Sequence, residues 1–424
     1  MSTVPCFLDA DLHGKTVLVR MDHNVVKNGK IKDPMRIDAT IPTLLHIYKK
    51  GGKPVLMTHV GRPYDKKTGA ITISEGDAVE PIVKYIETKL QLQGLVPQCA
   101  ASGPEGITDL APLAAAVRDL KERKADFVYL PNTRWFQGEE AKDDSADIFA
   151  QGLASLADLY VNDAFGSWQA HASTYNVTKF LPSYAGLLML KEIANLQKVF
   201  EPKRPLVSVV AGSKFDTKIG PLSSLIKLSD KLVLGGVLYN AYLAVKYGLR
   251  IKGLDQGDLD LAAQFLKDVE AYKDRIVELP CIIESDSFEN ADSWRMRRIS
   301  ELKPGTELNY VLDIAPESFA DPAVQAVFQG AETVFVNAVM GYTALFTEGT
   351  KALYTLIDGC GKSQKLFGGG DTIQDFGALL PGIFAKAAND PRYYFFTGGG
   401  AILDAIVQGS PYGMKPVQAL LQKA

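Results

Sequence analysis

The chain has 424 residues, of which 46% are hydrophobic, so it holds enough apolar material for more than one ordinary core and we expect two domains. Lysine and arginine together number 46 against 49 aspartates and glutamates, and the net charge of −3 excludes a general attraction for nucleic acid or anionic lipid. No run of about 18 apolar residues and no secretion signal occurs, and the four scattered cysteines form no disulfide framework, so we expect a cytoplasmic protein that crosses no membrane.

The first 185 residues alternate short apolar runs with longer helix-compatible stretches, which is typical of a parallel sheet covered by helices. The runs predict strands at residues 16–21, 54–57, 127–130 and 159–161. An amphipathic stretch at 108–124 predicts a helix that covers this sheet. We assign residues 1–185 to an N-terminal domain.

Apolar residues at helical spacing follow this domain and predict a helix over residues 190–200, which we place in an interdomain segment, 186–202. The alternation of strands and helices then resumes in residues 203–402, which we assign to a C-terminal domain. Strands are expected there at 206–210, 231–234, 275–279, 310–314, 333–336 and 393–396. The predicted fold class is therefore α/β, with two parallel-sheet domains joined by a helix.

Polar residues follow directly after many of these strands, where open parallel sheets bind their ligands. In the first half they are Asp22, His23 and Asn24, then His59, Gly61 and Arg62, then Asn132 and Arg134, then Asn162 and Asp163. In the second half they are Gly212, Ser213 and Lys214, then Gly235 and Gly236, then Asp313 and Asn337. The first half thus offers guanidinium groups and the second half offers glycines.

Two glycine triplets follow apolar runs near the end of the chain, Gly368-Gly369-Gly370-Asp371-Thr372 and Thr397-Gly398-Gly399-Gly400-Ala401. Glycines let the backbone approach an anion closely, and the N-terminus of a following helix favours negative charge. Asp371 could reach a magnesium ion, and Thr372 is expected to cap the next helix. Because single glycine runs are usually plain turns, the prediction of a phosphate site depends on their repetition.

Several sequence blocks resemble the phosphoglycerate kinase family, in order and over nearly the whole chain. They are residues 16–25 (TVLVRMDHNV), 57–63 (MTHVGRP), 160–166 (YVNDAFG), 211–214 (AGSK) with Lys218, and 368–372 (GGGDT). The resemblance implies two Rossmann-like domains around a cleft that closes by hinge bending. It also implies a C-terminal segment, residues 403–424, that returns to the N-terminal domain, and a monomer.

The resemblance implies that the N-terminal half binds 3-phosphoglycerate. Asp22 and Asn24 would hold its hydroxyl and carboxylate end, and Arg36 would face the reacting group. The phosphate would be gripped by His59, Arg62 and Arg134, whose neighbours His23, Val60 and Gly61 complete the predicted substrate site. Guanidinium forks suit phosphate oxygens, although a lone arginine at a strand end is more often a surface ion pair, and His59 could be a core histidine.

The resemblance implies that the C-terminal half binds ATP or ADP with Mg²⁺. The predicted nucleotide contacts are Gly212, Lys214, Lys218, Gly236, Asn337, Gly369, Gly370, Asp371 and Thr372, with Asp371 on the metal. The predicted catalytic residues are Arg36, Lys214, Gly370 and Gly400. The implied reaction moves a phosphoryl group between 1,3-bisphosphoglycerate and ADP, and because a carboxylate acceptor is already ionised, it requires no general base.

Two departures from the family pattern affect the predicted pockets. The block after residue 166 reads Ser167-Trp168-Gln169-Ala170-His171 and lacks an arginine of the triose site, and Ala344 stands where a ribose-binding glutamate is usual. A relative with altered acid or nucleotide specificity, or a non-catalytic nucleotide-binding regulator, therefore remains an alternative. A nicotinamide-dependent dehydrogenase is disfavoured, because no G-x-G-x-x-G follows the first strand.

Overall fold

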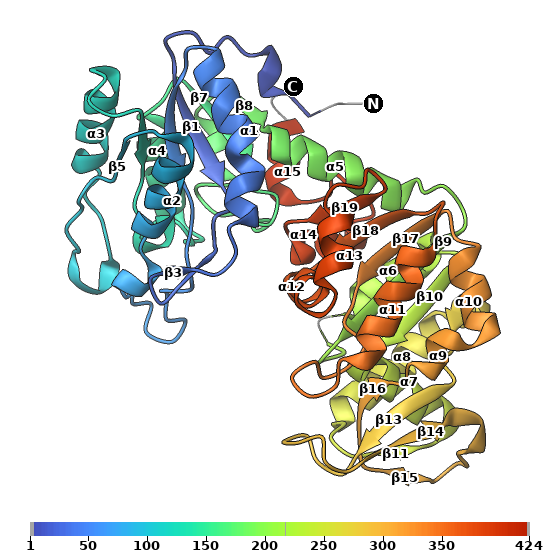
Figure 1. The fold of residues 1–424 in the computed structure, drawn as a ribbon. Coiled ribbons are helices and arrows are strands. Elements are labelled where there is room, and N and C mark those ends of the chain that lie inside the picture. The colour runs from blue at the N-terminus through green and yellow to red at the C-terminus, as the bar shows by residue number, and fades with distance from the viewer. Residues whose placement is uncertain (1–3, 217, 422–424) are drawn as a thin grey trace. The chain divides into compact units, whose positions relative to one another are not determined.

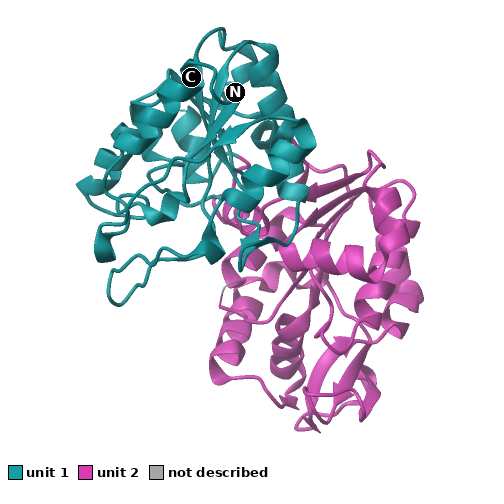
Figure 2. Cartoon of the chain, turned by 60° about the vertical axis from the view of Figure 1, so that its left-hand side comes forward, with its two compact units in different colours: residues 1–193, 412–424 teal, residues 194–411 magenta. Residues whose placement is uncertain are grey.

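The computed structural model describes residues 4–216 and 218–421, and the chain divides into two compact units (Figures 1 and 2). Unit 1 takes the residues up to 193 together with those from 412 onward, and unit 2 takes residues 194–411. No helix within the described ranges is long and apolar enough to cross a membrane.

Unit 1 is built on a six-stranded sheet whose strands all run parallel. In spatial order the strands are β5 (Gly94–Leu95), β6 (Phe127–Tyr129), β4 (Lys53–Met57), β1 (Thr16–Met21), β7 (Leu159–Asp163) and β8 (Ser183–Ala185). Every residue of β1 is buried, as expected for a central strand that is covered on both faces. A short antiparallel pair, β2 (Val26–Lys27) and β3 (Lys30–Ile31), follows β1.

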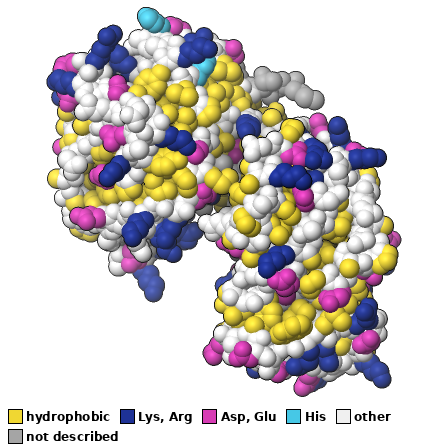
Figure 3. Space-filling model, in the orientation of Figure 1, with side chains coloured by type: hydrophobic (Ala, Val, Ile, Leu, Met, Phe, Trp, Pro, Cys, Tyr) yellow, Lys and Arg dark blue, Asp and Glu magenta, His cyan; other side chains and the backbone are white. Residues whose placement is uncertain are grey.

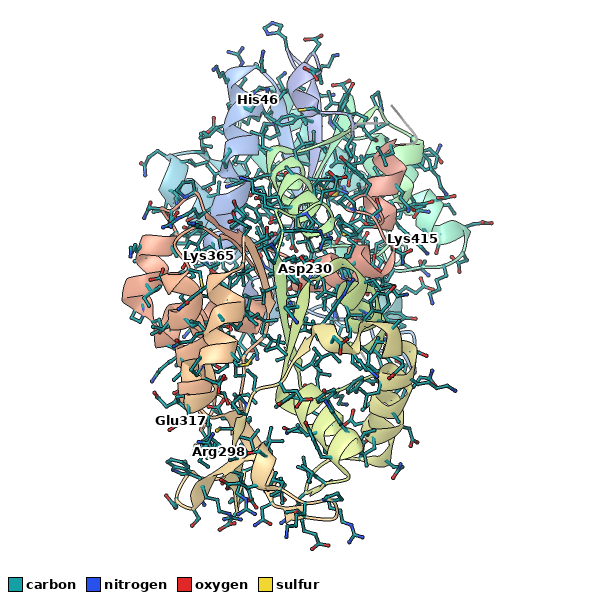
Figure 4. The ribbon with its side chains drawn as sticks, turned by 90° about the vertical axis from the view of Figure 1, so that its right-hand side faces the viewer. His46, Asp230, Arg298, Glu317, Lys365 and Lys415 are labelled. Carbon is teal, nitrogen blue, oxygen red and sulfur yellow. The ribbon has the colours of Figure 1, made fainter. Side chains whose placement is uncertain are left out.

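Helices lie on both sides of the strands of unit 1 (Figure 2). They are α1 (Met35–Lys49), α2 (Glu80–Leu90), α3 (Ala111–Lys121), α4 (Asp144–Ala154), the start of α5 (Leu187–Phe200) and α15 (Lys415–Leu421). The short α15 packs against β8, and its Lys415 and the His46 of α1 are both seen in Figure 4. The residues that α15 buries include Val417 and Leu420, so an apolar face holds this end of the chain on unit 1.

Unit 2 contains a second parallel sheet of six strands. The order is β12 (Ile276–Val277), β10 (Lys231–Gly235), β9 (Leu206–Gly212), β17 (Thr333–Asn337), β18 (Gln364–Gly368) and β19 (Tyr393–Phe396). Its helices are α6 (Ile219–Leu228), α7 (Gly236–Tyr247), α8 (Gln256–Asp268), α9 (Glu317–Ala320), α10 (Pro322–Gln329), α11 (Glu348–Gly359), α12 (Gly370–Leu379), α13 (Pro381–Ala387) and α14 (Gly399–Val407).

A smaller β region lies at one end of unit 2 (Figure 1). It holds an antiparallel sheet of β14 (Trp294–Arg298), β13 (Cys281–Ser285) and β16 (Tyr310–Ile314), and a parallel pair of β11 (Arg250–Ile251) and β15 (Glu307–Leu308). The strand expected at residues 310–314 is thus present, but it belongs to this separate sheet. An isolated apolar run cannot reveal its partners, because pairing is decided by the connections on either side.

The mixed fold with two parallel sheets confirms the predicted α/β class. Both sheets reverse their strand order beside a central strand. In unit 1 the chain moves from β1 to β4 on one side and later returns to β7 on the other, and in unit 2 it moves from β9 to β10 and returns to β17. Ligands of open α/β sheets bind beyond the carboxyl ends of the strands at such reversals, so each unit has one expected site.

Candidate functional site

The carboxyl end of β1 places a buried carboxylate at the reversal point of unit 1. Asp22 is 2% exposed, and its Oδ1 lies 3.4 Å from the Ser167 hydroxyl that donates to it. Arg36 Nη1 lies 3.5 Å from the other oxygen, Oδ2, which has no hydrogen-bond partner among the described residues. A buried carboxylate oxygen is costly to leave without a hydrogen bond. Oδ2, beside a half-buried guanidinium, is therefore a candidate to accept a hydrogen bond from a ligand.

His59, which follows β4, is held in one tautomer by Arg20 of β1. Nη2 of Arg20 lies 2.8 Å from Nδ1 of the ring, and a guanidinium can only donate, so Nδ1 accepts. Burial, with the charges of Arg20 and Arg134, holds the pKa of His59 well below its usual value. The ring is therefore neutral with its proton on Nε2, and that N–H is the single donor it can offer.

Arg20 is itself fully buried and is connected to a buried carboxylate through a hydroxyl group. Its Nε donates to Ser173 Oγ at 2.9 Å, and this hydroxyl donates to Glu139 Oε1 at 2.6 Å. Thr133 Oγ1 and the Ser173 amide also donate to Glu139, each at 3.0 Å. The network was not predicted from the sequence, although a charged residue inside the apolar run of residues 16–21 was a signal for it.

Asn132 ties together the two loops that carry the remaining predicted phosphate contacts. Its Oδ1 accepts from the Val60 amide at 3.0 Å and from the Arg134 amide at 3.1 Å, and its Nδ2 donates to the Val60 carbonyl at 2.7 Å. The Gly61 amide donates to Asn24 Oδ1 at 3.0 Å, and Arg134 Nη1 donates to the Gly61 carbonyl at 2.6 Å. The structure thus brings Asn24, Val60, Gly61 and Arg134 together.

Gly61 and Arg134 each face a constraint in this arrangement. Gly61 has φ +64°, and a Cβ there would lie 2.6 Å from the Asp77 carboxylate, so no larger residue fits without movement. Nη2 of Arg134 lies 2.9 Å from Glu140 Oε1, and burial lowers the pKa of this guanidinium from its ordinary value. An anion that binds Arg134 must therefore share it with Glu140.

Two predicted substrate residues differ in how they are placed. Arg62 is exposed, whereas the ring of His23 is fully buried. Thr40 gives its hydroxyl proton to the Ile37 carbonyl, so it accepts from His23 Nε2 at 2.8 Å, and Nδ1 accepts from the Tyr129 hydroxyl at 2.9 Å. Burial lowers the pKa of His23 to about 3, and both ring nitrogens and the backbone amide, which donates to Thr58 Oγ1 at 3.0 Å, are already used within the protein.

The block that lacks an arginine is present as an irregular loop after β7. Gln169 is exposed, Trp168 is half-buried, and the Gln169 carbonyl accepts from Thr174 Oγ1 at 2.7 Å. His171 Nε2 lies 3.5 Å from Glu140, and burial lowers its pKa to about 4 although Glu140 acts in the opposite direction. This loop therefore supplies no guanidinium in place of the missing arginine.

In unit 2, the reversal point between β9 and β17 holds a lysine and an asparagine. Lys218 Nζ donates to Asn337 Oδ1 at 2.7 Å, and Asn337 Nδ2 donates to the Gly368 carbonyl at 2.7 Å. Burial lowers the pKa of Lys218 to about 8, although the nearby Asp371 carboxylate raises it. This lysine is therefore partly deprotonated just above neutral pH, and a bound anion would favour its charged form.

The glycine loops of unit 2 pack backbone against backbone. Gly369 has φ +115°, and a Cβ on Gly399 would lie 2.6 Å from the Gly369 Cα. Gly236 has φ +59°, and a Cβ there would lie 2.9 Å from the Gly212 carbonyl oxygen. These close approaches need residues without side chains. The first brings the starts of α12 and α14 together, and the second brings the start of α7 to the end of β9.

The two triplets lead into the first turns of α12 and α14, where unpaired amides favour anions. Gly370 and Asp371 begin α12, with Asp371 exposed, and Gly400 lies in the first turn of α14. The expectation that Thr372 caps α12 was wrong, because the helix starts two residues earlier, with Gly369 at the cap position and Thr372 buried within the first turn. Lys214, just after β9, is exposed.

The loop after β17, where the family's glutamate is replaced, leads into α11, whose first turn is bound by a buried carboxylate. Asp313 accepts from the amides of Ile314 at 2.9 Å and Gly349 at 3.0 Å, and burial raises its pKa to about 7. Ala344 is exposed in this loop. Among the residues described, no three His, Cys, Asp or Glu side chains gather as they would around a metal ion, so Asp371 would have to share a magnesium ion with oxygens of a ligand.

Cationic side chains and glycine-framed helix starts at the reversal points of two parallel sheets define an α/β protein built to bind phosphate groups. The family model described as phosphoglycerate kinase matches residues 7–409. The chain therefore belongs to the phosphoglycerate kinase family, whose members are phosphotransferases, and the resemblance found in the sequence is confirmed.

Individual relatives give the same result. The chain is 36% identical to a phosphoglycerate kinase of Roseiflexus castenholzii over 405 residues, covering 94% of this chain and 95% of that protein. It is 33% identical to one of Pseudothermotoga lettingae, covering 93% and 94%. The solved phosphoglycerate kinase of Coxiella burnetii matches with a TM-score of 0.78 and 25% identity over the whole of both chains. That of Pyrococcus horikoshii, at 20% identity and a TM-score of 0.74 over 99% and 98%, shows the same fold.

Proposed function

We propose that this chain transfers a phosphoryl group reversibly between 1,3-bisphosphoglycerate and ADP, giving 3-phosphoglycerate and ATP, as a monomer in the cytoplasm. The observation that supports the proposal is a pair of candidate anion sites beyond the carboxyl ends of the two parallel sheets. One is made by His59, Arg134 and their loops, and the other by Lys218, Asn337 and the glycine-framed helix starts. Each suits one of the two phosphorylated substrates of such a transfer.

Unit 1 would bind the triose. The Nε2–H of His59 and the guanidiniums of Arg62 and Arg134 are donors for its phosphate, which carries acceptor oxygens only. The hydroxyl and carboxylate end would meet Asp22 and Asn24, with Arg36 neutralising the charge that develops on the reacting carboxylate.

Unit 2 would bind the nucleotide. Its phosphates would be held by backbone amides in the first turns of α12 and α14, which contain Gly370 and Gly400. Gly212, Gly236 and the amide side chain of Asn337 would add further contacts, and Lys214 and Lys218 would supply positive charge. The carboxylate of Asp371 is a hard oxygen ligand suited to Mg²⁺, which when bound neutralises phosphate charge. Hinge bending would then bring the two bound substrates together and exclude water.

Alignment and charge neutralisation are sufficient for this chemistry, because the acceptor carboxylate is ionised near neutral pH. The exposed Gln169 and Ala344 leave the triose and the ribose without one contact each. Each missing charge-assisted contact would weaken binding by about 1.5–3 kcal/mol, so we expect raised KM values rather than a lost reaction. A different acid or nucleotide is the alternative that these two positions favour.

The test is a coupled assay of 1,3-bisphosphoglycerate formation from 3-phosphoglycerate and MgATP. Lys214→Ala and Asp371→Ala should abolish turnover, whereas Lys227→Ala and Asp375→Ala, which remove the same residue types from nearby helices, should leave it within about twofold. No turnover of the unsubstituted protein at saturating substrate, with ATP binding retained in calorimetry, would instead favour a different acid or a regulatory role.

A further inference from the structure

Unit 2 contains a hollow of about 790 Å³ that lies outside both reversal points. Its walls come from α7, β11, α8, β15 and two neighbouring strands of the antiparallel sheet, β13 and β14, and none of the residues predicted to bind nucleotide lines it. The volume falls within the range of about 300–1,000 Å³ that is typical of small-molecule sites. The hollow is therefore large enough for a ligand of its own.

Positive charge predominates in the lining. The cationic residues are Arg250, Lys252, Arg295 and Arg297, and the acidic ones are Glu284 and Glu307. Arg295 and Arg297 stand two residues apart on β14, so they share one face of the strand. Figure 3 shows Lys and Arg side chains interspersed with Asp and Glu at the end of unit 2 where β11 and β15 are labelled in Figure 1.

Glu284 lies within ion-pair distance of both arginines, and both of its carboxylate oxygens accept hydrogen bonds. It is 2% exposed and lies opposite Arg295 in the strand pairing. Arg295 donates to its Oε1 at 2.6 Å and to its Oε2 at 3.0 Å, and the Asn309 amide also donates to Oε1, at 2.8 Å. Arg297 Nε lies 3.1 Å from Oε2 but has no hydrogen-bond partner there. One carboxylate therefore faces two guanidiniums, and the second of them keeps unused donors.

The other two cations are also poorly neutralised. Lys252 Nζ lies 4.6 Å from the centre of the Tyr310 ring, and no ion pair of this lysine is found among the described residues. Arg250 pairs with Glu307 at 3.0 Å, but both side chains are about three-quarters exposed, where such pairs contribute little. Asp286 pairs with Arg295 at 2.8 Å, and it is near enough to interact with the charge of Lys252 without forming an ion pair with it. The surplus charge is therefore concentrated at Arg297 and Lys252.

Apart from Asn309, the rest of the wall is apolar. It consists of Ala244, Leu249, Ile251, Leu254, Leu259 and Leu308. We propose that this hollow binds a small organic phosphate monoester, whose dianionic head lies between Arg297 and Lys252 and whose carbon skeleton lies against the leucines. A guanidinium fork and an ammonium group match a phosphate better than a single carboxylate, because the phosphate offers several acceptor oxygens and a second charge.

The test is isothermal titration calorimetry with phenyl phosphate as the probe. Arg297→Gln and Lys252→Gln should each weaken its binding about tenfold or more, since each removes a charge-assisted contact. Arg298→Gln is the matched control, because Arg298 follows on the same strand with its side chain on the opposite face, at the same end of unit 2 (Figure 4). It should bind the probe like the unsubstituted protein, and phenol should not bind.

Equal affinities for Arg297→Gln and Arg298→Gln would overturn the proposal, since the probe would then be bound elsewhere. No saturable binding to the unsubstituted protein would do the same. Unfolding midpoints of the three variants reveal any loss of folding, and Lys252→Gln, which breaks no ion pair, keeps the test valid if Arg297→Gln is unstable. The result does not depend on the proposed transfer reaction, because neither variant alters a residue assigned to it.

Discussion

Arg20 acts on the candidate site through another residue. It has no exposed surface, yet it fixes which nitrogen of His59 carries the proton and lowers the pKa of that ring. Burying a guanidinium costs free energy unless its N–H groups are hydrogen-bonded. Here the Ser173 hydroxyl connects Arg20 to the Glu139 carboxylate, which supplies the opposite charge without touching Arg20 directly. The neutrality of His59 is therefore a property of the whole buried network.

We expect Arg20→Gln to raise the pKa of His59, because the second-largest cause of its depression is removed while burial remains. Arg20→Lys keeps the charge, so it should leave the pKa low although it loses the fork geometry. NMR titration of the His59 ring would measure both. An unchanged pKa in Arg20→Gln would mean that burial alone holds the ring neutral.

Lys218 should make nucleotide binding depend on pH. Its pKa of about 8 means that the ammonium is charged below pH 8 and is lost as the pH rises through that value. ADP affinity should therefore fall above pH 8, by about tenfold once the charge is gone. Lys218→Arg stays charged throughout, so titrations between pH 7 and 9.5 should show a flatter profile for this variant. The same slope in both proteins would assign the pH dependence to another group.

At the level of single elements, most strands could be predicted because they are short, apolar and bounded by polar residues. The strands expected at residues 16–21 and 393–396 have those bounds in the structure, and the helix expected over 108–124 is Ala111–Lys121. The strand Trp294–Arg298 was not predicted, because it lies at a sheet edge and three of its five residues are arginines. Its stability comes from pairing with β13, which a local pattern does not reveal.

The candidate site could be predicted only in part, for a related reason. Polar residues after strands marked its position, since strand ends meet at one sheet edge. The pattern did not separate His59 from His23, because whether a ring nitrogen is free depends on residues far away in sequence, such as Tyr129. Arg20, Glu139 and Ser173 were missed because long-range hydrogen bonds leave no local signature.

The backbone conformation of Gly369, at the start of α12, gives a prediction about the stability of the protein. Gly369→Ala should destabilise the protein by about 1–3 kcal/mol, because the new side chain must adopt φ +115° and would lie 2.9 Å from Asn337 Nδ2. Gly370→Ala is the control one residue further on, where no atom lies within 4 Å, and it should be neutral or slightly stabilising. Denaturant unfolding followed by the fluorescence of Trp294 would measure both. Equal losses would show that the backbone at Gly369 is not constrained.

For the whole molecule, α15 ties the end of the chain to unit 1. Leu420 is fully buried there, and Leu420→Ala should cost about 2–5 kcal/mol, whereas the exposed Gln418→Ala on the same helix should cost almost nothing. In variants whose only tryptophan is Trp135, fluorescence reports the unfolding of unit 1. In variants whose only tryptophan is Trp294, it reports the unfolding of unit 2. We expect the Leu420 substitution to shift the Trp135 transition alone. A matching shift at Trp294 would mean that the two units unfold together.

The backbone contact between Gly369 and Gly399 has a mechanical consequence for unit 2. With the Gly399 position so close to the Gly369 Cα, the first turns of α12 and α14 have no side-chain layer between them that could yield or slide. We therefore expect the two turns to move together when unit 2 moves. An anion that draws the amides of one helix start toward it should therefore displace the other helix start in the same direction.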